Sequence, residues 1–250
     1  MGIVCTPLYL SLCPPRRFKY LARMPPVMDK NLASRWDEEY QRGRYKDEPH
    51  IGFVRQIIET LEENPRARAG RGLYIGCGSG RNYIPLADSG LDIIGIDISR
   101  VAIERLSARA PGLAGNITHA DFEDYEAGMF EYAVSIQTFQ HGTQEKTAGY
   151  FAKVSRILRP GGLLFLRVNS SSTQIRLRHA VTEKGGSGGF TVRYLEGPKK
   201  DLDVRFYSLA ELKDLCRGFD YVHPALENVT ARAQGGGAWS QWELILKKND

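Results

Sequence analysis

Apolar positions along residues 72–217 follow two periods in alternation. Short apolar runs of strand length are separated by segments in which apolar residues repeat every three or four positions, as on one face of a helix. The runs predict strands at residues 72–75, 92–96, 117–119, 132–136 and 163–168, and the other segments predict helices at residues 82–88, 100–109, 145–158 and 209–217. Strands that alternate with helices predict a parallel sheet with right-handed crossovers and helices on both faces.

The two flanks of this region carry different patterns. Before it, apolar residues at helical spacing predict two short helices, which end at Pro65 and Gly70; the apolar residues are Trp36, Tyr40, Phe53, Ile57, Ile58 and Leu61. After it, residues 221–229 and 239–247 are β-like and are joined by three glycines, which predicts an antiparallel hairpin at the sheet edge. The predicted fold is therefore α/β, a doubly wound, mostly parallel seven-stranded sheet with helices on both faces and an antiparallel C-terminal hairpin.

Residues 1–29 form a basic tail of a different composition. Prolines interrupt its apolar stretch, and four basic residues supply much of the formal net charge of +5; they are Arg16, Arg17, Lys19 and Arg23. We expect the tail to be disordered and not to be a secretory signal, so the predicted domain is residues 30–250. The start matches an N-myristoylation pattern at Gly2, but so short a pattern often arises by accident, and no membrane partner is expected.

Composition excludes several classes of protein. Hydrophobic residues make up 42% and charged residues 25% of the chain, as in soluble globular proteins, and no apolar run is long enough to span a bilayer. Outside the tail the charges are nearly balanced, so nucleic acid is not an expected partner. The four cysteines lack metal-ligand spacing and are too sparse for a disulfide scaffold, which predicts no metal site and a cytoplasmic location; they are Cys5, Cys13, Cys77 and Cys216.

A glycine-rich turn, residues 75–80 (IGCGSG), lies directly between the first predicted strand and the next helix. Gly76, Gly78 and Gly80 permit positive φ and the close approach of a bound molecule, while free amides at the start of the helix favour an anionic group. The dinucleotide fingerprint GxGxxG needs its third glycine where this chain has Arg81, which argues against a nicotinamide cofactor.

Acidic residues follow the next two predicted strands. Asp97 ends the second strand, at a distance from the glycine turn that suits a carboxylate gripping two ribose hydroxyls. Its alternative role is to cap the following helix, although Ser99 suits that task better. Asp121 follows the third strand, where it could bind an adenine amino group with Phe122 beside the ring; its alternative role is to cap a loop.

Three features in this order resemble the class I S-adenosylmethionine-dependent methyltransferases over residues 36–247. They are the glycine turn, the strand-end Asp97, and residues 157–163 (ILRPGGL), which are similar to the family's LRPGG turn before the fifth strand. The resemblance implies a Rossmann-like fold whose last strand is antiparallel, with S-adenosylmethionine as the cofactor. The residues expected to bind it are Trp36, Tyr40, Gly76, Cys77, Gly78, Gly80, Asp97, Ile98, Asp121, Phe122 and Gln137.

Two further segments indicate which branch of the family the chain resembles. Residues 36–40 (WDEEY) and 206–212 (FYSLAEL) are similar to small-molecule methyltransferases of the tellurite-resistance and methyltransferase type 11 branch. One position departs from the family, because Tyr74 stands where an acid commonly helps to organise the ammonium end of the cofactor. The tyrosine could form a hydrogen bond through its hydroxyl, or it could pack and leave that task to another group.

Methyl transfer from a sulfonium is an in-line displacement, so it depends on alignment and requires no metal. Residues 135–141 leave the fourth predicted strand at the carboxyl edge of the sheet, where ligands bind in such folds, and they lack the Asn/Asp-Pro-Pro-aromatic loop of enzymes that methylate base amines. His141 could deprotonate a hydroxyl or thiol, or it could be a structural residue at a helix start. Gln137 could orient the acceptor or the methionine carboxylate, or it could be a solvated strand-end residue.

Two segments could close over the site. Trp36 and Tyr40, with Tyr45, are expected to cover the cofactor pocket, because look-alike enzymes fold this region over it; ordinary helix packing is the alternative. Residues 185–189 (GGSGG) lie in an insertion before the last predicted helix and are interpreted as a mobile lid or as a solvent-exposed linker.

These features predict an enzyme that transfers a methyl group from S-adenosylmethionine to a small-molecule acceptor by in-line displacement. One alternative is a non-catalytic protein that binds the cofactor or a nucleoside. Another is an NAD(P)-dependent oxidoreductase, which the missing third glycine argues against. The sequence leaves open whether oxygen, nitrogen, sulfur or a metalloid is methylated, and it leaves open the oligomeric state.

Overall fold

The computed structural model describes residues 30–43, 48–126, 128–232 and 236–250. The predictions for the tail at residues 1–29, for Gly2 and for Tyr45 lie outside the described residues. None of the helices in the described part of the chain has the length and apolar content of a membrane span.

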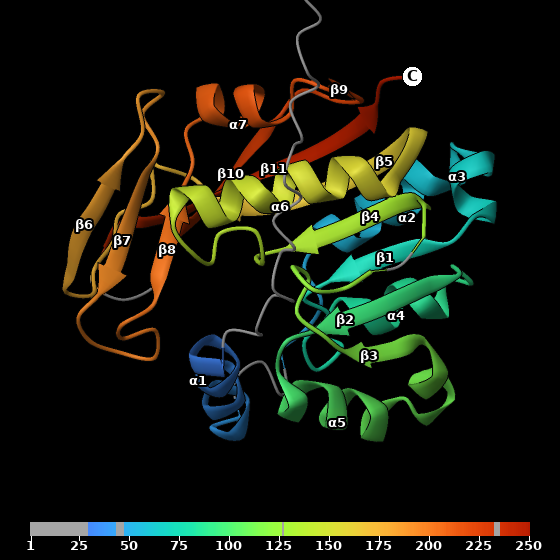
Figure 1. Ribbon diagram of the computed structural model, residues 1–250, viewed down its shortest axis with the longest axis horizontal. Helices are drawn as coiled ribbons and strands as arrows, with labels where there is room; N and C mark the ends of the chain where they lie inside the picture. Colours follow the sequence, from blue (N-terminus) through green and yellow to red (C-terminus); the bar gives the residue numbers. More distant parts are fainter. Residues whose placement is uncertain (1–29, 44–47, 127, 233–235) are drawn as a thin grey trace, which may run out of the picture.

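The main sheet runs in the order β10-β11-β5-β4-β1-β2-β3, with β9 also paired to β11 (Figure 1). Its strands are β1 Gly72–Ile75, β2 Ile93–Asp97, β3 Ile117–His119, β4 Phe130–Ile136, β5 Leu158–Asn169, β9 Phe219–Tyr221, β10 Leu226–Ala231 and β11 Ala238–Lys248. Strands β1 to β5 are parallel, whereas β11 is antiparallel to β5 and to β10. The predicted doubly wound sheet with an antiparallel hairpin is confirmed, and β9 is an additional strand.

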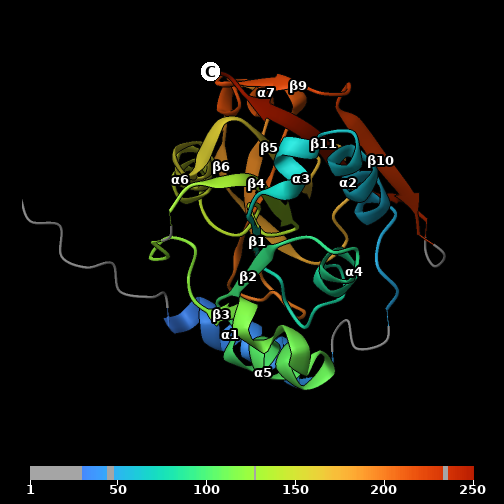
Figure 2. The ribbon, with the colours of Figure 1, turned by 90° about the vertical axis from the view of Figure 1, so that its right-hand side faces the viewer.

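Helices cover both faces of this sheet (Figure 2). One apolar layer joins it to α2 Phe53–Glu62, α3 Pro65–Ala69, α4 Tyr83–Asp88 and α5 Arg100–Arg109, and the other joins it to α6 Gln144–Ile157 and α7 Leu209–Leu215. A short 3₁₀ helix, η1 Pro111–Asn116, leads into β3. Because successive strand residues point to opposite faces, Tyr74 packs in the first layer and Leu73 in the second. All of β1 is buried, as expected for a central strand covered on both sides.

Local capping determines where the helices near the carboxyl edge begin and end. Ser99, Thr143 and Ser208 precede α5, α6 and α7, and each side chain accepts a hydrogen bond from an amide of the first turn. Helix α6 ends at Ile157, so the predicted helix stop is confirmed. The segment expected as a turn instead begins β5 at Leu158, before the predicted start at residue 163, and Gly161 has a φ of 72° within it.

Several boundaries differ from the prediction, and for two of them prolines provide a reason. Pro65 does more than end α2, because it occupies the first turn of the short helix α3, where a missing amide is tolerated. The strand predicted at residues 221–229 is divided into β9 and β10, which both pair with β11. Pro224 lies in the gap, and a proline cannot donate a hydrogen bond to a neighbouring strand.

A second, three-stranded antiparallel sheet is a feature that the sequence pattern does not predict. It consists of β6 His179–Lys184, β7 Phe190–Tyr194 and β8 Asp203–Phe206. Its own small core contains Val192, Tyr194, Val204 and Phe206. Figure 1 shows this sheet on the side toward which β1, β2 and β4 point. A bridge between His141 and Val204 connects it to the segment that follows β4.

The glycine run at residues 185–189 forms the turn between β6 and β7. Its backbone lies against the buried ion pair of Arg205 and Glu211, in which Nη2 and Oε1 are 2.5 Å apart. A Cβ atom at Gly189 would overlap with Oε2 of Glu211. Glycine at this position therefore serves close packing, while the mobility expected for the run stays a prediction.

Candidate functional site

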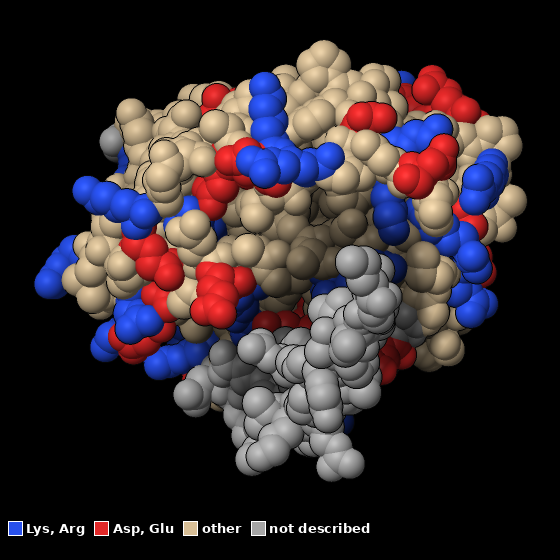
Figure 3. Space-filling view, turned by 45° about the horizontal axis from the view of Figure 1, so that its top comes forward, with Lys and Arg blue, Asp and Glu red and all other residues tan. Residues whose placement is uncertain are grey.

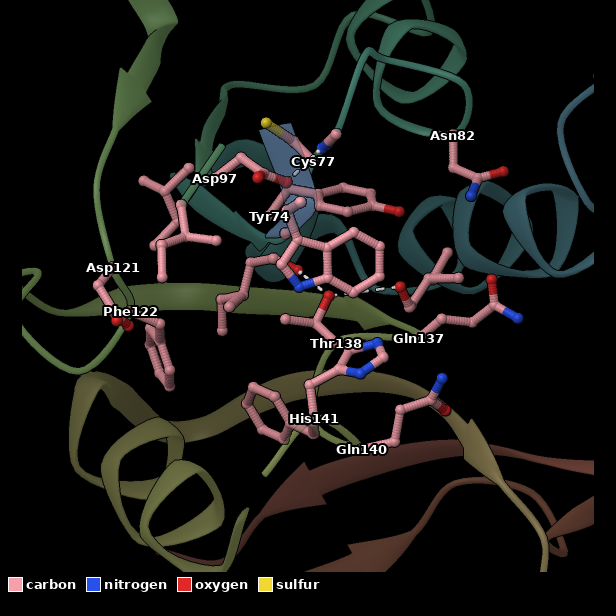
Figure 4. A pocket seen from close by; sticks show the side chains of 18 of the residues that line it. Tyr74, Cys77, Asn82, Asp97, Asp121, Phe122, Gln137, Thr138, Gln140 and His141 are labelled. Atoms are coloured by element: carbon pink, nitrogen blue, oxygen red, sulfur yellow. Dashed lines mark hydrogen bonds between the residues drawn. The ribbon is translucent and has the colours of Figure 1, made fainter. Parts of the chain in front are cut away.

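The carboxyl ends of β1, β2, β3 and β4 open onto one cavity (Figure 4). After β1 the chain crosses to β2 on one side, and after β4 it crosses to β5 on the other side. Ligands of open α/β sheets bind at the edge where the connections diverge in this way. The cavity is lined by the predicted residues Trp36, Tyr40, Gly76, Cys77, Gly78, Asp97, Ile98, Asp121, Phe122, Gln137 and His141. Figure 3 shows a hollow in the middle of one face of the molecule, with mostly uncharged walls and charged side chains around it.

The glycine turn forms a cradle at the floor of the cavity. Gly76 and Gly78 have φ angles of 75° and 56°, which L side chains rarely adopt. A Cβ atom at Gly76 would overlap with the hydroxyl of Thr138, and one at Gly78 would overlap with the hydroxyl of Tyr40. Gly80 differs from the prediction, because it does not line the cavity; it has a φ of 92° and packs against Leu106.

Asp97 is the buried acid at the centre of the site. Its Oδ2 accepts a hydrogen bond of 2.8 Å from the amide of Gly78, and its Oδ1 accepts one of 2.8 Å from the amide of Ser99. Burial raises the pKa of its carboxyl to about 6, and the two amides oppose that rise. The helix-cap alternative is wrong, because the Ser99 side chain caps α5.

Asp121 and Phe122 form the wall beyond β3. The Asp121 carboxylate is buried, and its Oδ1 accepts a hydrogen bond of 3.0 Å from the amide of Glu123. Asp121 therefore both caps the loop and lines the cavity. The Phe122 ring stacks on Phe139, with the ring centroids 5.6 Å apart. One side of this aromatic ring is thus fixed by the core.

Tyr74 both packs and forms a hydrogen bond. Its ring meets that of Tyr83 edge-on, with the centroids 6.0 Å apart. Burial raises the pKa of its hydroxyl, and a hydrogen bond with the Asn82 side chain opposes that rise. Asn82 is itself positioned, because its Oδ1 accepts a hydrogen bond of 3.1 Å from the amide of Ile51. An uncharged pair therefore occupies the place of the family's acid.

Cys77 forms part of the wall and is not a nucleophile. Burial raises the pKa of its thiol well above the usual value, and the negative charge of Asp97 adds to that rise. The thiol therefore stays protonated at neutral pH.

Gln137 has a strained backbone at the end of β4. Its φ is 61°, an angle that costs a non-glycine residue about 1 kcal/mol or more. The strained residue is held by its amide, which donates a hydrogen bond of 2.8 Å to the carbonyl of Arg167. Gln137 is half-buried and lines the cavity, unlike a solvated strand-end residue. Such strain clusters at functional sites, and the sequence carried no signal for it.

His141 lies buried on the opposite side of the cavity from the glycine turn (Figure 4). The Trp36 ring meets its imidazole edge-on, with the centroids 4.8 Å apart. Its amide donates a hydrogen bond of 3.1 Å to the carbonyl of Thr138. It lies three residues before α6, which begins at Gln144, and its backbone bridges to Val204 of the second sheet.

Helix α1 Lys30–Gln41 contributes the aromatic cover. Trp36 and Tyr40 project from the same face of the helix, with ring centroids 6.4 Å apart, and both line the cavity. Asp37 ties the helix to the start of α5, because its Oδ1 accepts hydrogen bonds from Ser99 and Val101. Arg35 forms an ion pair of 3.6 Å with Asp201 of the second sheet. Helix α1 is therefore joined to α5 on one side and to the turn between β7 and β8 on the other.

Among the lining residues that the sequence did not predict, three come from distant parts of the chain. Leu32 comes from α1, Lys199 from the turn between β7 and β8, and Trp239 from the start of β11. No local motif marks them. The placement of α1, the second sheet and the last strand brings them to one cavity.

Charged residues line several parts of the cavity. Asp97 and Asp121 belong to the ends of β2 and β3, Arg81 follows the glycine turn, and Lys199 comes from the turn between β7 and β8. Within the described residues, no group of three or more His, Cys, Asp or Glu side chains is placed to hold a metal ion.

Comparison with known proteins gives a consistent result. A family model described as "Methyltransferase domain" matches residues 73–162. The chain is 23% identical over 193 residues to "Probable thiol methyltransferase 2" of Arabidopsis thaliana, which covers 74% of this chain and 78% of the relative.

Solved structures show the same fold. The 1,6-didemethyltoxoflavin-N1-methyltransferase of Burkholderia thailandensis superposes with a TM-score of 0.62 and 18% identity, covering 88% of each chain. TehB from Haemophilus influenzae superposes with a TM-score of 0.58 and 16% identity, covering 86% of this chain and 67% of that one.

Proposed function

Because the chain is a class I S-adenosylmethionine-dependent methyltransferase, we propose that it methylates a small molecule enclosed between the glycine turn, α1 and the second sheet. The observation that carries this proposal is the position of Asp97. Its buried carboxylate is fixed by the amide of Gly78 and lines the cavity beside the glycine cradle. A carboxylate placed in this way can accept both hydroxyls of a ribose.

The residues present fit the cofactor. Gly76 and Gly78 line the cavity with backbone alone, so a ligand can approach their amides without meeting a side chain of the turn. Asp97 with Ile98 would hold the ribose, and Asp121 with Phe122 would hold the adenine. We propose that Tyr74, through its hydroxyl, and the strained Gln137 would hold the amino-acid end.

S-adenosylmethionine, when bound, supplies an electrophilic methyl group on a positively charged sulfur. The contribution of the chain is to align this group with the acceptor and to exclude water. Trp36 and Tyr40 would help to exclude water and would also attract the positively charged sulfur, because both aromatic rings line the cavity.

His141 is our candidate for the general base. An imidazole can take a proton from a hydroxyl or thiol near neutral pH. The edge-on contact with Trp36 restricts the orientation of the ring. For an acceptor that is already ionised, His141 would position the acceptor without removing a proton.

The acceptor is proposed to be small because three separate elements bound the cavity and limit the room for it. They are α1 with Trp36, the turn between β7 and β8 with Lys199, and β11 with Trp239. Both a relative described as a thiol methyltransferase and a structural neighbour that acts on 1,6-didemethyltoxoflavin agree with a small acceptor. We further propose a cytoplasmic location, because Cys77 and Cys216 are free, buried thiols, as in a reducing compartment.

Calorimetry followed by a labelled-methyl screen tests the proposal. S-adenosylmethionine and S-adenosylhomocysteine should bind the full chain, and Asp97→Asn should weaken both. The labelled cofactor should then transfer its methyl group to at least one of a set of thiols, phenols, amines and oxyanions. Binding without transfer to any class would indicate a non-catalytic cofactor-binding protein. Absence of binding would overturn the proposal altogether.

A further inference from the structure

We propose that Gln140 selects the acceptor, by donating a hydrogen bond from its side-chain nitrogen to an uncharged carbonyl oxygen of that molecule. This inference rests on the proposed function and adds the chemical class of the acceptor. It concerns the cavity wall that follows β4, where Gln140 directly precedes His141 in the chain.

Gln140 lies on the acceptor side of the cavity. Figure 4 shows its side chain on the same side as His141, across the cavity from Cys77 of the glycine turn. Gln140 lines the cavity, although only 1% of its surface is exposed to solvent. Because the acceptor has to lie between the methyl donor and the candidate base, the residue next to that base is within its reach.

The carboxamide of Gln140 has a fixed orientation. Its Oε1 accepts a hydrogen bond of 2.8 Å from the amide of Asn169, and since a backbone amide can only donate, the atom that faces it has to be the oxygen. Its Nε2 is therefore turned the other way, and Figure 4 shows it on the side of Gln137. Within the described part of the chain, no hydrogen bond uses this nitrogen. Gln140 thus presents a donor, and not an acceptor, to a ligand.

Both partners of this contact are held by the surrounding strands. The carbonyl of Gln140 accepts a hydrogen bond of 2.7 Å from the amide of Arg205 in β8. The carbonyl of Asn169, the last residue of β5, accepts one of 2.9 Å from the amide of Tyr207. The donor is therefore fixed before a ligand arrives, which reduces the entropy lost on binding.

The residues behind Gln140 favour an uncharged oxygen. Asn169 lies opposite Gln241 in the ladder between β5 and β11, and both residues are buried. The next pair on the same face, Arg167 and Glu243, forms an ion pair of 2.8 Å, so these two charges offset each other. A carboxylate bound at Gln140 would lose hydration without gaining a counter-ion from these residues, whereas a carbonyl oxygen carries no net charge to desolvate.

The same wall is polar beyond what the protein itself uses. Among the described residues, Nδ2 and Oδ1 of Asn169 and Nε2 of Gln241 are buried without a hydrogen-bond partner. Trp239 precedes Gln241 by two residues on the same face of β11 and lines the cavity, so this polar stretch adjoins it. Buried polar atoms are usually paired with protein, water or ligand. A polar group of the acceptor is therefore favoured here over a hydrocarbon.

Four probes of matched size test the proposal on the full chain saturated with S-adenosylhomocysteine. Acetophenone carries the carbonyl, α-methylstyrene has a methylene group in place of that oxygen, and benzoate and benzylammonium carry charges of opposite sign. Their affinities are measured by titration followed by NMR. Acetophenone should bind about five- to ten-fold more tightly than α-methylstyrene, and more tightly than either ion.

Two variants assign this preference to the side chain. Gln140→Met has a similar length but no donor, so acetophenone and α-methylstyrene should bind equally. Gln140→Glu keeps an oxygen for the amide of Asn169 and presents a second oxygen to the cavity, so it should weaken acetophenone and favour benzylammonium. Gln56→Glu, at an exposed position of α2 outside the cavity, is the matched control and should behave as the parent.

Because Gln140→Glu retains the contact with Asn169, it decides the question even if Gln140→Met fails to fold. Equal binding of acetophenone and α-methylstyrene to the parent, tighter binding of either ion, or no binding of any probe would overturn the proposal. A carbonyl preference that persists in a folded Gln140 variant would overturn it as well. Failure of the proposed function is distinct, since it would show earlier as absence of S-adenosylhomocysteine binding.

Discussion

The hydroxyl of Ser99 donates a hydrogen bond of 2.6 Å to Oδ1 of Asp37. The same Ser99 oxygen accepts the amide of Ala102 and so caps α5, and its own amide binds Oδ1 of Asp97. One serine therefore connects the helix that covers the cavity with the acid on its floor. A change in the position of α1 is therefore expected to alter the position of Asp97.

Asp37→Ala should loosen the cover. It removes the acceptor of two hydrogen bonds to the start of α5, so S-adenosylmethionine should bind about three- to ten-fold more weakly. Calorimetry measures the affinity, and thermal unfolding reports any loss of stability. Glu38→Ala is the control, because the Glu38 side chain lies on the same helix and forms ion pairs with Arg35 and Arg42 at the surface. If both variants bound S-adenosylmethionine with equal affinity, the Asp37 hydrogen bonds would not be what holds α1 over the cavity.

Asp97→Asn should weaken cofactor binding by about ten- to one-hundred-fold, because a charged acceptor of hydroxyl hydrogen bonds is lost. The amide keeps the size of the side chain, so the fold should persist. Asp92→Asn provides a matched comparison at the other end of β2, where the carboxylate pairs with Arg71 at 3.0 Å. If Asp97→Asn bound as tightly as the parent, the ribose would have to lie elsewhere.

The affinity for S-adenosylmethionine should fall in acid. The carboxyl of Asp97 has a pKa of about 6 in the folded, ligand-free chain, raised from 3.8 by burial. Because the raised pKa belongs to an acid, protonation of Asp97 stabilises the fold below pH 3.8, and this contribution is lost as pH rises through about 6. Ribose binding requires the ionised form, so affinity at pH 5 should be about ten-fold below that at pH 7. Calorimetry across this range should give a flat profile for Asp97→Asn.

Gly78→Val should abolish cofactor binding. The new side chain would occupy the cradle and overlap with the hydroxyl of Tyr40, and the φ of 56° would be strained. Backbone strain by itself is tested by Gly90→Val, because Gly90 has a φ of 82° and nothing within 4 Å of an added Cβ atom. Both variants should unfold at lower temperature, but only Gly78→Val should lose affinity. Normal binding by folded Gly78→Val would exclude this cavity.

Replacement of Trp36 and Tyr40 by alanine should weaken the cofactor several-fold, since an aromatic contact to a cation contributes about 0.5–2 kcal/mol. Turnover should fall as well, because His141 loses the ring that packs against it. If the double variant unfolded at a lower temperature but kept its affinity and turnover, α1 would be a scaffold and not a cover.

The sequence by itself determined those features that depend on residues close together in the chain. The strand at Gly72–Ile75 and the helix at Arg100–Arg109 have the predicted bounds, because burial on both faces and a serine cap leave a direct mark on neighbouring residues. The glycine turn and Asp97 were found for the same reason. Both lie at the end of a recognisable strand, and a parallel sheet necessarily brings such ends together.

Tertiary structure decided what depends on residues that are distant in the chain. The strand His179–Lys184 is mostly exposed, so it carries no apolar pattern, and it exists because Phe190–Tyr194 pairs with it. Gly80 is needed because Leu106 packs against it, and Gln137 is strained because the carbonyl of Arg167 holds its amide. Lys199 and Trp239 meet the cofactor site only through the placement of the second sheet and the last strand. Contacts of this kind are set by long-range packing, which no local period in the sequence records.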